Sequence, residues 1–301
     1  MTSKLFPAQR KPLWSWLAAQ PRIWFALLTI TICSAVAHAS PPQLVYVITA
    51  GAKGPQFGAV NLTNGHFLPI GKPEPALMVD LVWWKGSLLS LAQSDPYAGD
   101  LVRIDPSTGA MSVIGATGLG YNAFSIAAYG GILYLADISG NLYTVDPHTG
   151  AATFLAATGM PPDTVTPFTT NSDGTLNLCD QTFYATGGSL YVTLDAFNID
   201  PNTLALDKDP SHISISPALY RINPATGSAT LVGPTYFQFG ATVALRGRFY
   251  GFRLAPTGFA NGAPTAFSEL FTIDASTGQP TFIRVIDPDA GTIFGAAPIL
   301  P

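Results

Sequence analysis

A recurring phrase of fifteen residues constrains the fold of this chain more than any other feature. It reads LVRIDPSTGAMSVIG at 101–115, with further copies at 142–156, 219–233 and 270–284 and a degenerate copy at 57–71. Repetition of this kind is the sequence signature of an array in which one supersecondary unit is built several times. The first question is therefore which unit the phrase encodes.

Each copy has the pattern of a β-hairpin. In LYTVDPHTG (142–150) apolar and polar residues alternate and then meet Asp146-Pro147. The Asp side chain can accept a hydrogen bond from the turn backbone, and Pro fixes φ at the next position. Gly150 then supplies the positive φ with which the chain re-enters the ladder. The same glycine recurs as Gly65, Gly109, Gly227 and Gly278.

A second phrase lies between the hairpins and predicts two more strands. Small and apolar residues lead into a Gly-containing turn, and an aromatic or aliphatic strand leads out of it. The copies are LVWWKGSLLSLAQ (81–93), FSIAAYGGILYLAD (124–137), FYATGGSLYVTLD (183–195) and VALRGRFYGF (243–252). Four strands per unit make one blade of a β-propeller. We therefore expect an all-β chain of four-stranded blades.

The spacing of the turn glycines predicts the number of blades. Successive glycines are 44, 41, 77 and 51 residues apart, against about 40–50 residues for familiar blade repeats. The 77-residue interval contains only one Gly-turn phrase, and its surplus falls near 160–175 and 196–217, both rich in Pro, Asp, Asn, Ser and Thr. Five blades with two insertions are expected, and six blades are the alternative.

The two ends of the repeat region predict how the ring closes. GTIFGAAPIL (291–300) resembles an innermost strand with no partners after it, while QLVYVITA (43–50) is a strand with no innermost strand before it. Pairing the two would complete a shared blade and remove exposed sheet edges. Residues 40–301 are therefore expected to form one propeller domain.

Residues 1–39 have the pattern of a secretory signal peptide. A basic segment precedes the apolar run from Ile23 to Ala37, and Ala37-His38-Ala39 has the small residues of a cleavage site. The run is shorter than the roughly 20 apolar residues of a membrane span. We expect an exported protein, periplasmic or extracellular. An uncleaved signal segment is the alternative and would be its only membrane attachment.

Charge argues against nucleic-acid binding. Lys4, Arg10, Lys11 and Arg22 are the only charged residues among the first 39, so the remainder has 10 basic against 18 acidic residues and a net charge near −8. Such a surface repels phosphate groups. Removal of the leader also leaves Cys179 as the single cysteine, which excludes an intramolecular disulfide.

The chain resembles secreted bacterial β-propeller proteins with LYxIDPxTG-type repeats, in the broad YVTN/WD40-like superfamily. The resemblance rests on the two phrases above and covers roughly residues 43–300. It implies the propeller fold. Many such propellers are binding scaffolds, while some relatives are lactonases or quinoprotein oxidoreductases. No active-site phrase of either enzyme group is found in this sequence.

No catalytic constellation stands out. The histidines after the leader, at 66, 148 and 212, lack metal-ligand spacing, and no GxSxG phrase is present. No cofactor is evident. Oxygen-rich loops can bind calcium, so the acidic insertion is a candidate calcium site, although its spacing differs from an EF-hand and a solvated loop is the alternative. Its acids are Asp195, Asp200, Asp207 and Asp209.

Propeller ligands usually bind where the innermost strands converge on the central channel. Alignment of these strands on their Gly turns gives six tentative ligand-binding positions: Asp80, Asn122, Ser125, Asp180, Gln238 and Thr292. Asp80 and Asp180 matter most, because an acid in an apolar strand is costly unless it is paired, hydrated or used. The alternative is that they hydrogen-bond neighbouring blades or channel water.

The sequence therefore favours a non-enzymatic exported scaffold that binds an unidentified protein, glycan or small ligand. One alternative is an enzyme, either a lactonase-like hydrolase or a quinoprotein-like oxidoreductase, that uses acids at the channel mouth. A structural protein of the cell envelope is the other.

Overall fold

The computed structural model of the protein describes residues 43–51, 54–73, 76–160, 176–186, 188–199, 215–260 and 263–300. These all belong to the second of two compact units, Met1–Pro41 and Pro42–Pro301. The predicted signal peptide lies outside the described residues, as do most positions of the two predicted insertions. Among the described residues, no helix has the length and apolar character needed to cross a bilayer.

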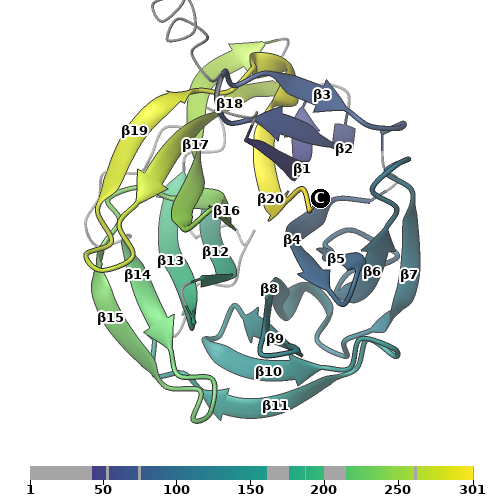
Figure 1. The fold of residues 1–301 in the computed structure, drawn as a ribbon, viewed down its shortest axis with the longest axis vertical. Coiled ribbons are helices and arrows are strands. Elements are labelled where there is room, and N and C mark those ends of the chain that lie inside the picture. The colour runs from purple at the N-terminus through teal and green to yellow at the C-terminus, as the bar shows by residue number, and fades with distance from the viewer. Residues whose placement is uncertain are drawn as a thin grey trace, which may run out of the picture. The chain divides into compact units, whose positions relative to one another are not determined.

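The described residues form five antiparallel sheets of four strands each (Figure 1). From the innermost strand outward, blade 1 contains β20 (Thr292–Pro298), β1 (Leu44–Gly51), β2 (Gly54–Asn61) and β3 (Phe67–Pro69). Blade 2 contains β4 (Met78–Trp84), β5 (Ser87–Ala92), β6 (Asp100–Ile104) and β7 (Met111–Ala116). Blade 3 contains β8 (Ala123–Tyr129), β9 (Ile132–Asp137), β10 (Asn141–Val145) and β11 (Ala152–Ala157).

The last two blades have longer strands. Blade 4 contains β12 (Leu176–Thr186), β13 (Ser189–Ile199), β14 (Ile215–Ile222) and β15 (Ala229–Pro234). Blade 5 contains β16 (Phe239–Leu245), β17 (Arg248–Ala260), β18 (Ala263–Ile273) and β19 (Pro280–Val285). Among the described residues, two short 3-10 helices precede innermost strands, η2 (Gly120–Asn122) and η3 (Pro288–Ala290).

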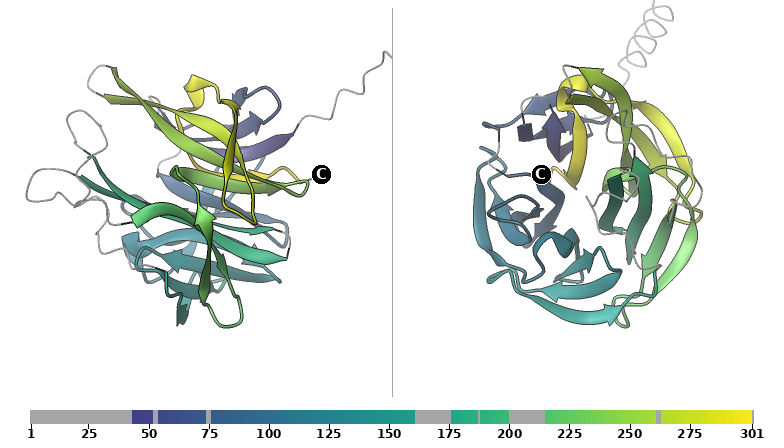
Figure 2. Two further views of the ribbon diagram at one scale, coloured as in Figure 1. Left: turned by 90° about the vertical axis from the view of Figure 1, so that its left-hand side faces the viewer. Right: turned by 180° about the vertical axis from the view of Figure 1, so that it is seen from behind.

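The blades form a closed ring, as Figure 2 also shows from the side and from behind. Each innermost strand contacts the innermost strands of both neighbours, in the cyclic order β4, β8, β12, β16, β20. The predicted five-bladed propeller is confirmed. The 77-residue interval holds a single blade, and the six-blade alternative is not what the chain forms.

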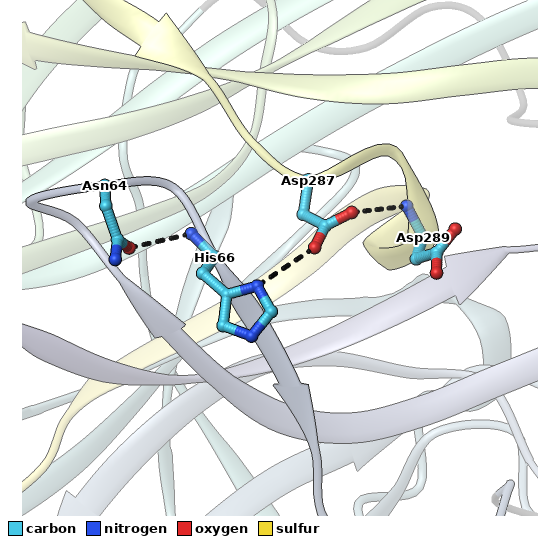
Figure 3. Close-up of polar contacts among 4 residues, drawn as sticks. All are labelled: Asn64, His66, Asp287 and Asp289. Atoms are coloured by element: carbon cyan, nitrogen blue, oxygen red, sulfur yellow. Dashed lines mark hydrogen bonds and ion pairs between the residues drawn. The ribbon is translucent and has the colours of Figure 1, made fainter.

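The predicted closure is also confirmed, because β20 pairs with β1, with Tyr46 opposite Ala297. A polar clasp supports it on the side of blade 5 (Figure 3). The Nδ1 atom of His66 lies 3.3 Å from a carboxylate oxygen of Asp287, and the backbone N–H of Asp287 donates to the carbonyl of Gly65 over 2.9 Å. The carboxylate of Asp287 also accepts from the backbone N–H of Asp289, at the start of η3.

The recurring phrase forms the same turn in every blade. Its Asp or Asn side chain accepts from the backbone N–H two residues later, as Asp105 does from Ser107 over 2.8 Å and Asp146 from His148 over 2.8 Å. Asn61, Asn223 and Asp274 repeat the contact. The hydrogen bonds from Ser107 hold the pKa of Asp105 below its usual value. The acids of these turns are thus accounted for by local structure.

The turn glycines also join the blades, each lying against the outer strand of the preceding one. Gly150 shows why no side chain fits there: its φ is +80°, and an added Cβ would lie 2.2 Å from the carbonyl oxygen of Gly115. The corresponding added atoms of the other four glycines would lie within 2.8 Å of a neighbour. We call these five contacts the outer junctions: Gly109–Ile70, Gly150–Gly115, Gly227–Ala156, Gly278–Gly233 and Gly65–Val285.

The hydrophobic core is divided among the spaces between blades. Each of its five clusters draws buried side chains mainly from two adjacent blades, and Phe57, Phe239 and Phe252 are among the largest that are fully buried. Burying apolar area in this way is the main driving force for folding. Packing between adjacent blades therefore holds the ring together.

Candidate functional site

Asp80 is the most unusual residue of the central channel. It lies in the innermost strand β4 with a φ of +51°, a conformation that few residues other than glycine adopt. The ladder between β4 and β5 shifts register at this point, between Val79 and Val82. The hydroxyl of Ser90 donates to the carbonyls of both Val79 (2.9 Å) and Asp80 (2.7 Å). This bulge turns the side chain of Asp80 away from its own sheet.

The carboxylate of Asp80 reaches two other blades. It accepts from the hydroxyl of Ser125 and from the backbone N–H of Ile126 over 3.1 Å, both on β8, and from the backbone N–H of Phe183 on β12. An innermost strand has no partner on its channel side, so its backbone groups there lack a ladder. Asp80 supplies acceptors for such groups on two strands at once.

Burial dominates the electrostatics of this acid. Asp80 is 4% exposed, and burial raises its pKa from 3.8 to about 7. The hydrogen bonds from Ser125, Ile126 and Phe183 favour the charged form and act in the opposite direction, without offsetting the loss of water. Asp80 therefore changes its protonation state near neutral pH.

Further hydroxyl contacts continue around the channel. Thr182 on β12 shares a 2.7 Å hydrogen bond with Thr193 and donates to Thr242 on β16 over 2.9 Å. All three threonines are buried. We refer to Asp80, Ser125, Thr182, Thr193 and Thr242 as the channel belt.

The belt is also in contact with the closing strand. Gly295 of β20 lies so close to the backbone of Asp80 that an added Cβ would be 2.7 Å from the carbonyl carbon of that residue. The bulge at Asp80 therefore touches blade 1 on one side and binds blades 3 and 4 on the other. Together with the Thr182–Thr242 bond, it connects all five innermost strands.

Of the six predicted ligand-binding residues, Asp80 and Ser125 are in direct contact. Asn122 is exposed in η2, Gln238 is half-buried just before β16, and Thr292 is buried at the start of β20. Asp180 pairs with Asp195 across β12 and β13 through the backbone, and the side chains of both lie outside the described residues.

The predicted calcium loop stays untested. Asp200, Asp207 and Asp209 lie outside the described residues. In the part of the chain that the structure describes, no group of three or more His, Cys, Asp or Glu side chains is placed to hold a metal ion. His66 is in the clasp of Figure 3, and His148 packs its ring 5.9 Å from that of Trp84.

Sequence reasoning missed a cavity at one end of the channel. It has a volume of about 170 Å³ and is lined by residues of all five blades, nearly all of them apolar, such as Leu81, Ile126, Phe183 and Val243. Pro298 and Leu300 border it as well, and the indole N–H of Trp83 donates to the carbonyl of Pro298 over 2.7 Å. The belt therefore lies behind an apolar mouth rather than beneath a cluster of acids.

A larger and more open cavity of about 580 Å³ lies between blades 4 and 5. Tyr191 comes from blade 4, while Gly247, Arg248 and Phe249 come from the first turn of blade 5. The repeat turn of blade 5 borders the opposite side through Asp274, Ala275 and Gln279. No catalytic motif marks these residues in the sequence, so sequence patterns do not predict this cavity.

Comparison with known proteins adds no family. No model of a protein family matches the sequence, and no curated protein matches it well enough to count as a relative. The specific repeat family inferred from the sequence therefore stays a resemblance.

Proposed function

We propose that this protein is an exported binding scaffold that holds a partner or ligand on its propeller and catalyses no reaction. The observation that carries the proposal is the use of Asp80. Its carboxylate accepts from three donors on two neighbouring blades, so the most unusual acid of the channel is engaged in holding the ring together.

The chemistry around the channel supports the same conclusion. A general acid or base needs a reacting group within hydrogen-bond reach, and the mouth next to Asp80 is bordered almost entirely by aliphatic and aromatic side chains. Binding sites, in contrast, are typically concave and largely apolar with a few polar groups, which describes the cavity at the channel mouth.

Export is part of the proposal and rests on the sequence. Residues 1–39 combine a basic segment, an apolar run and a small-residue cleavage site. Partners would accordingly be molecules of the periplasm or the cell exterior. N-terminal sequencing of the protein recovered from fractionated cells tests this point, and a mature chain beginning near Ser40 is the expected result.

One observation favours the enzyme alternative. A carboxyl group with a pKa of about 7 is what acid–base catalysis at neutral pH requires. A lactonase-like reaction would then depend on Asp80 directly.

The two functions separate in one experiment. Purified mature protein is assayed for hydrolysis of a panel of lactones and for reduction of a quinone-linked dye, beside the Asp80→Asn variant. The scaffold proposal expects no turnover from either protein above that of buffer. Turnover by the wild-type chain that is lost in Asp80→Asn, while circular dichroism shows the variant folded, would establish the enzyme instead.

A further inference from the structure

In two places an aromatic side chain at the end of one blade's innermost strand packs against the first turn of the next blade. We call this position the seat of the receiving blade. Trp84, the last residue of β4, donates its indole N–H to the carbonyl of Gly131 in the first turn of blade 3, over 3.0 Å. Its ring also meets His148 of the repeat turn of that blade. Tyr129, the last residue of β8, likewise donates its hydroxyl to the carbonyl of Gly188 in blade 4, over 2.8 Å.

The seat of blade 5 lacks such an occupant in the sequence. Three residues end innermost strands at equivalent positions: Trp84, Tyr129 and Thr186. In each case a glycine of the first turn of the same blade follows two residues later. Blade 4 therefore offers blade 5 a threonine, which has no ring to fill the space. The cavity of about 580 Å³ lies at this place, bordered by Gly247, the counterpart of Gly131 and Gly188, and by the repeat turn of blade 5.

The walls of the open seat suit a flat ring. Tyr191 and Phe249 both border the cavity and both stack on the ring of Tyr184, with centroid distances of 5.2 Å and 3.7 Å. The hydroxyl of Tyr184 is buried and has no hydrogen-bond partner among the described residues. Aromatic surfaces of this kind favour stacked or edge-on contact with another ring.

The rim of the seat is polar. Arg248, Asp274 and Gln279 border it, together with Thr272 and Thr281. A polar rim around an aromatic floor matches a residue whose ring is apolar and whose edge carries a donor, since the edge can then bond to the turn backbone as Trp84 and Tyr129 do. A phenylalanine ring would leave that backbone without a donor.

We propose that the seat of blade 5 binds a tryptophan or tyrosine side chain of a partner polypeptide. This inference rests on the proposed scaffold function and specifies its partner. The partner would reproduce between blades 4 and 5 the contact that Trp84 makes within the chain between blades 2 and 3. Aromatic residues anchored in such pockets commonly dominate the affinity of protein interfaces.

The test uses N-acetyl-tryptophanamide, N-acetyl-tyrosinamide and N-acetyl-phenylalaninamide as probes of the whole mature chain, followed by amide chemical shifts in NMR titrations. Saturable shifts at Gly247, Arg248 and Ala275 are expected for the tryptophan and tyrosine probes. The phenylalanine probe should bind at least roughly fivefold more weakly, because it lacks the edge donor.

Two variants identify the seat. Ala275→Trp, on the repeat turn, and Thr186→Trp, which supplies the missing ring from blade 4, should each weaken the tryptophan probe by roughly tenfold or more. The matched control is Trp84→Ala, which opens the corresponding seat of blade 3. It should retain the first site and gain a second one, with new shifts at Gly131 and His148.

The outcomes are distinct from those of the catalytic assay. Absence of saturable shifts at Gly247 and Arg248 overturns the aromatic seat even if the chain proves to have no enzymatic activity. Shifts there with N-acetylglucosamine but with none of the amides would show a glycan site and also overturn it. Lactone turnover with normal probe binding would contradict the scaffold function alone.

Discussion

The outer junctions and the channel belt hold the same five blades together in two different ways. At the outer junctions a glycine of the repeat turn touches the preceding blade at every position around the ring. In the channel the contacts are hydrogen bonds made by side chains, and no two of them are alike. The carboxylate of Asp80 accepts from blades 3 and 4, and a pair of threonine hydroxyls joins blades 4 and 5.

The difference reflects what each contact requires. Close approach of two backbones needs only the absence of a side chain, so one residue type can satisfy it in all blades. A buried polar group instead needs a specific partner in a specific place. The contacts at the outer junctions can therefore be the same in every blade, while each contact of the channel belt differs from the others. Four predictions follow from this contrast.

The largest effect is expected at an outer junction. Gly150→Ala would place a Cβ 2.2 Å from the carbonyl oxygen of Gly115 at a φ of +80°. Strain and overlap together should cost roughly 4 kcal/mol or more of unfolding free energy, as measured by urea denaturation. Gly86→Ala is the matched control, since Gly86 has a φ of +81° but nothing within 4 Å of the added atom. Its cost should be only about 1–2 kcal/mol, and equal losses in the two variants would refute the packing argument.

The next effect concerns the pH dependence of the belt. The pKa of Asp80 is about 7 in the folded protein, whereas the ordinary value is 3.8. At a pH between these two values the folded state therefore binds one more proton at Asp80 than the unfolded state does. The stability that this residue contributes is thus greatest below about pH 4, declines as pH rises toward 7 and is then constant, a total loss of roughly 4 kcal/mol.

Asp80→Asn should abolish that decline. Urea denaturation of both proteins from pH 4 to pH 8 gives the difference in unfolding free energy, in which the other ionisable groups cancel. The wild-type chain should lose stability relative to the variant as pH rises across this range. A difference that does not change with pH would show that Asp80 is not buried as an acid.

A smaller effect is expected when the acceptors are removed altogether. Asp80→Ala leaves the hydroxyl of Ser125 and the backbone N–H groups of Ile126 and Phe183 without their partner, at a cost of about 1–3 kcal/mol at pH 5. Hydrogen exchange at Ile126 and Phe183 should accelerate more than exchange at the outer junction of Gly150. Uniform acceleration around the ring would mean that the belt has no local role.

The smallest effect is expected at the clasp. The side chains of His66 and Asp287 are 58% and 28% exposed, and exposed pairs contribute about 0–1 kcal/mol. His66→Ala should therefore lower the melting temperature by no more than about 3 °C at pH 6, with Asn64→Ala as a neighbouring control. A drop comparable to that of Gly150→Ala would mean that closure depends on the clasp rather than on the pairing of β1 with β20.

Sequence patterns were sufficient for the repeated part of the molecule. The hairpins, the number of blades and the pairing of β20 with β1 all follow from a phrase that recurs with small changes. Asp80 and Ser125 could also be selected, because each is polar in an otherwise apolar strand. Their contact could not, since it depends on the bulge at Asp80 and on the relative height of two strands in adjacent sheets.

The open seat of blade 5 was out of reach for a different reason. The residues that line it carry no catalytic motif, and the sequence has Thr186 at the position that Trp84 and Tyr129 occupy in two other blades. The aligned ends of the innermost strands, with Trp84, Tyr129 and Thr186 in register, are the signal that could have revealed it. The size of the side chain at this aligned position, rather than its chemical type, predicts the cavity.

The pairing of β20 with β1 has a consequence during synthesis. Blade 1 is the first to leave the ribosome, yet it acquires its fourth strand only when residues 292–298 have been made. Until then the nascent chain carries an open sheet edge at β1. More than two hundred residues are synthesised between the first three strands of this blade and its fourth strand, β20. The ring therefore cannot close before its last strand, β20, has been synthesised.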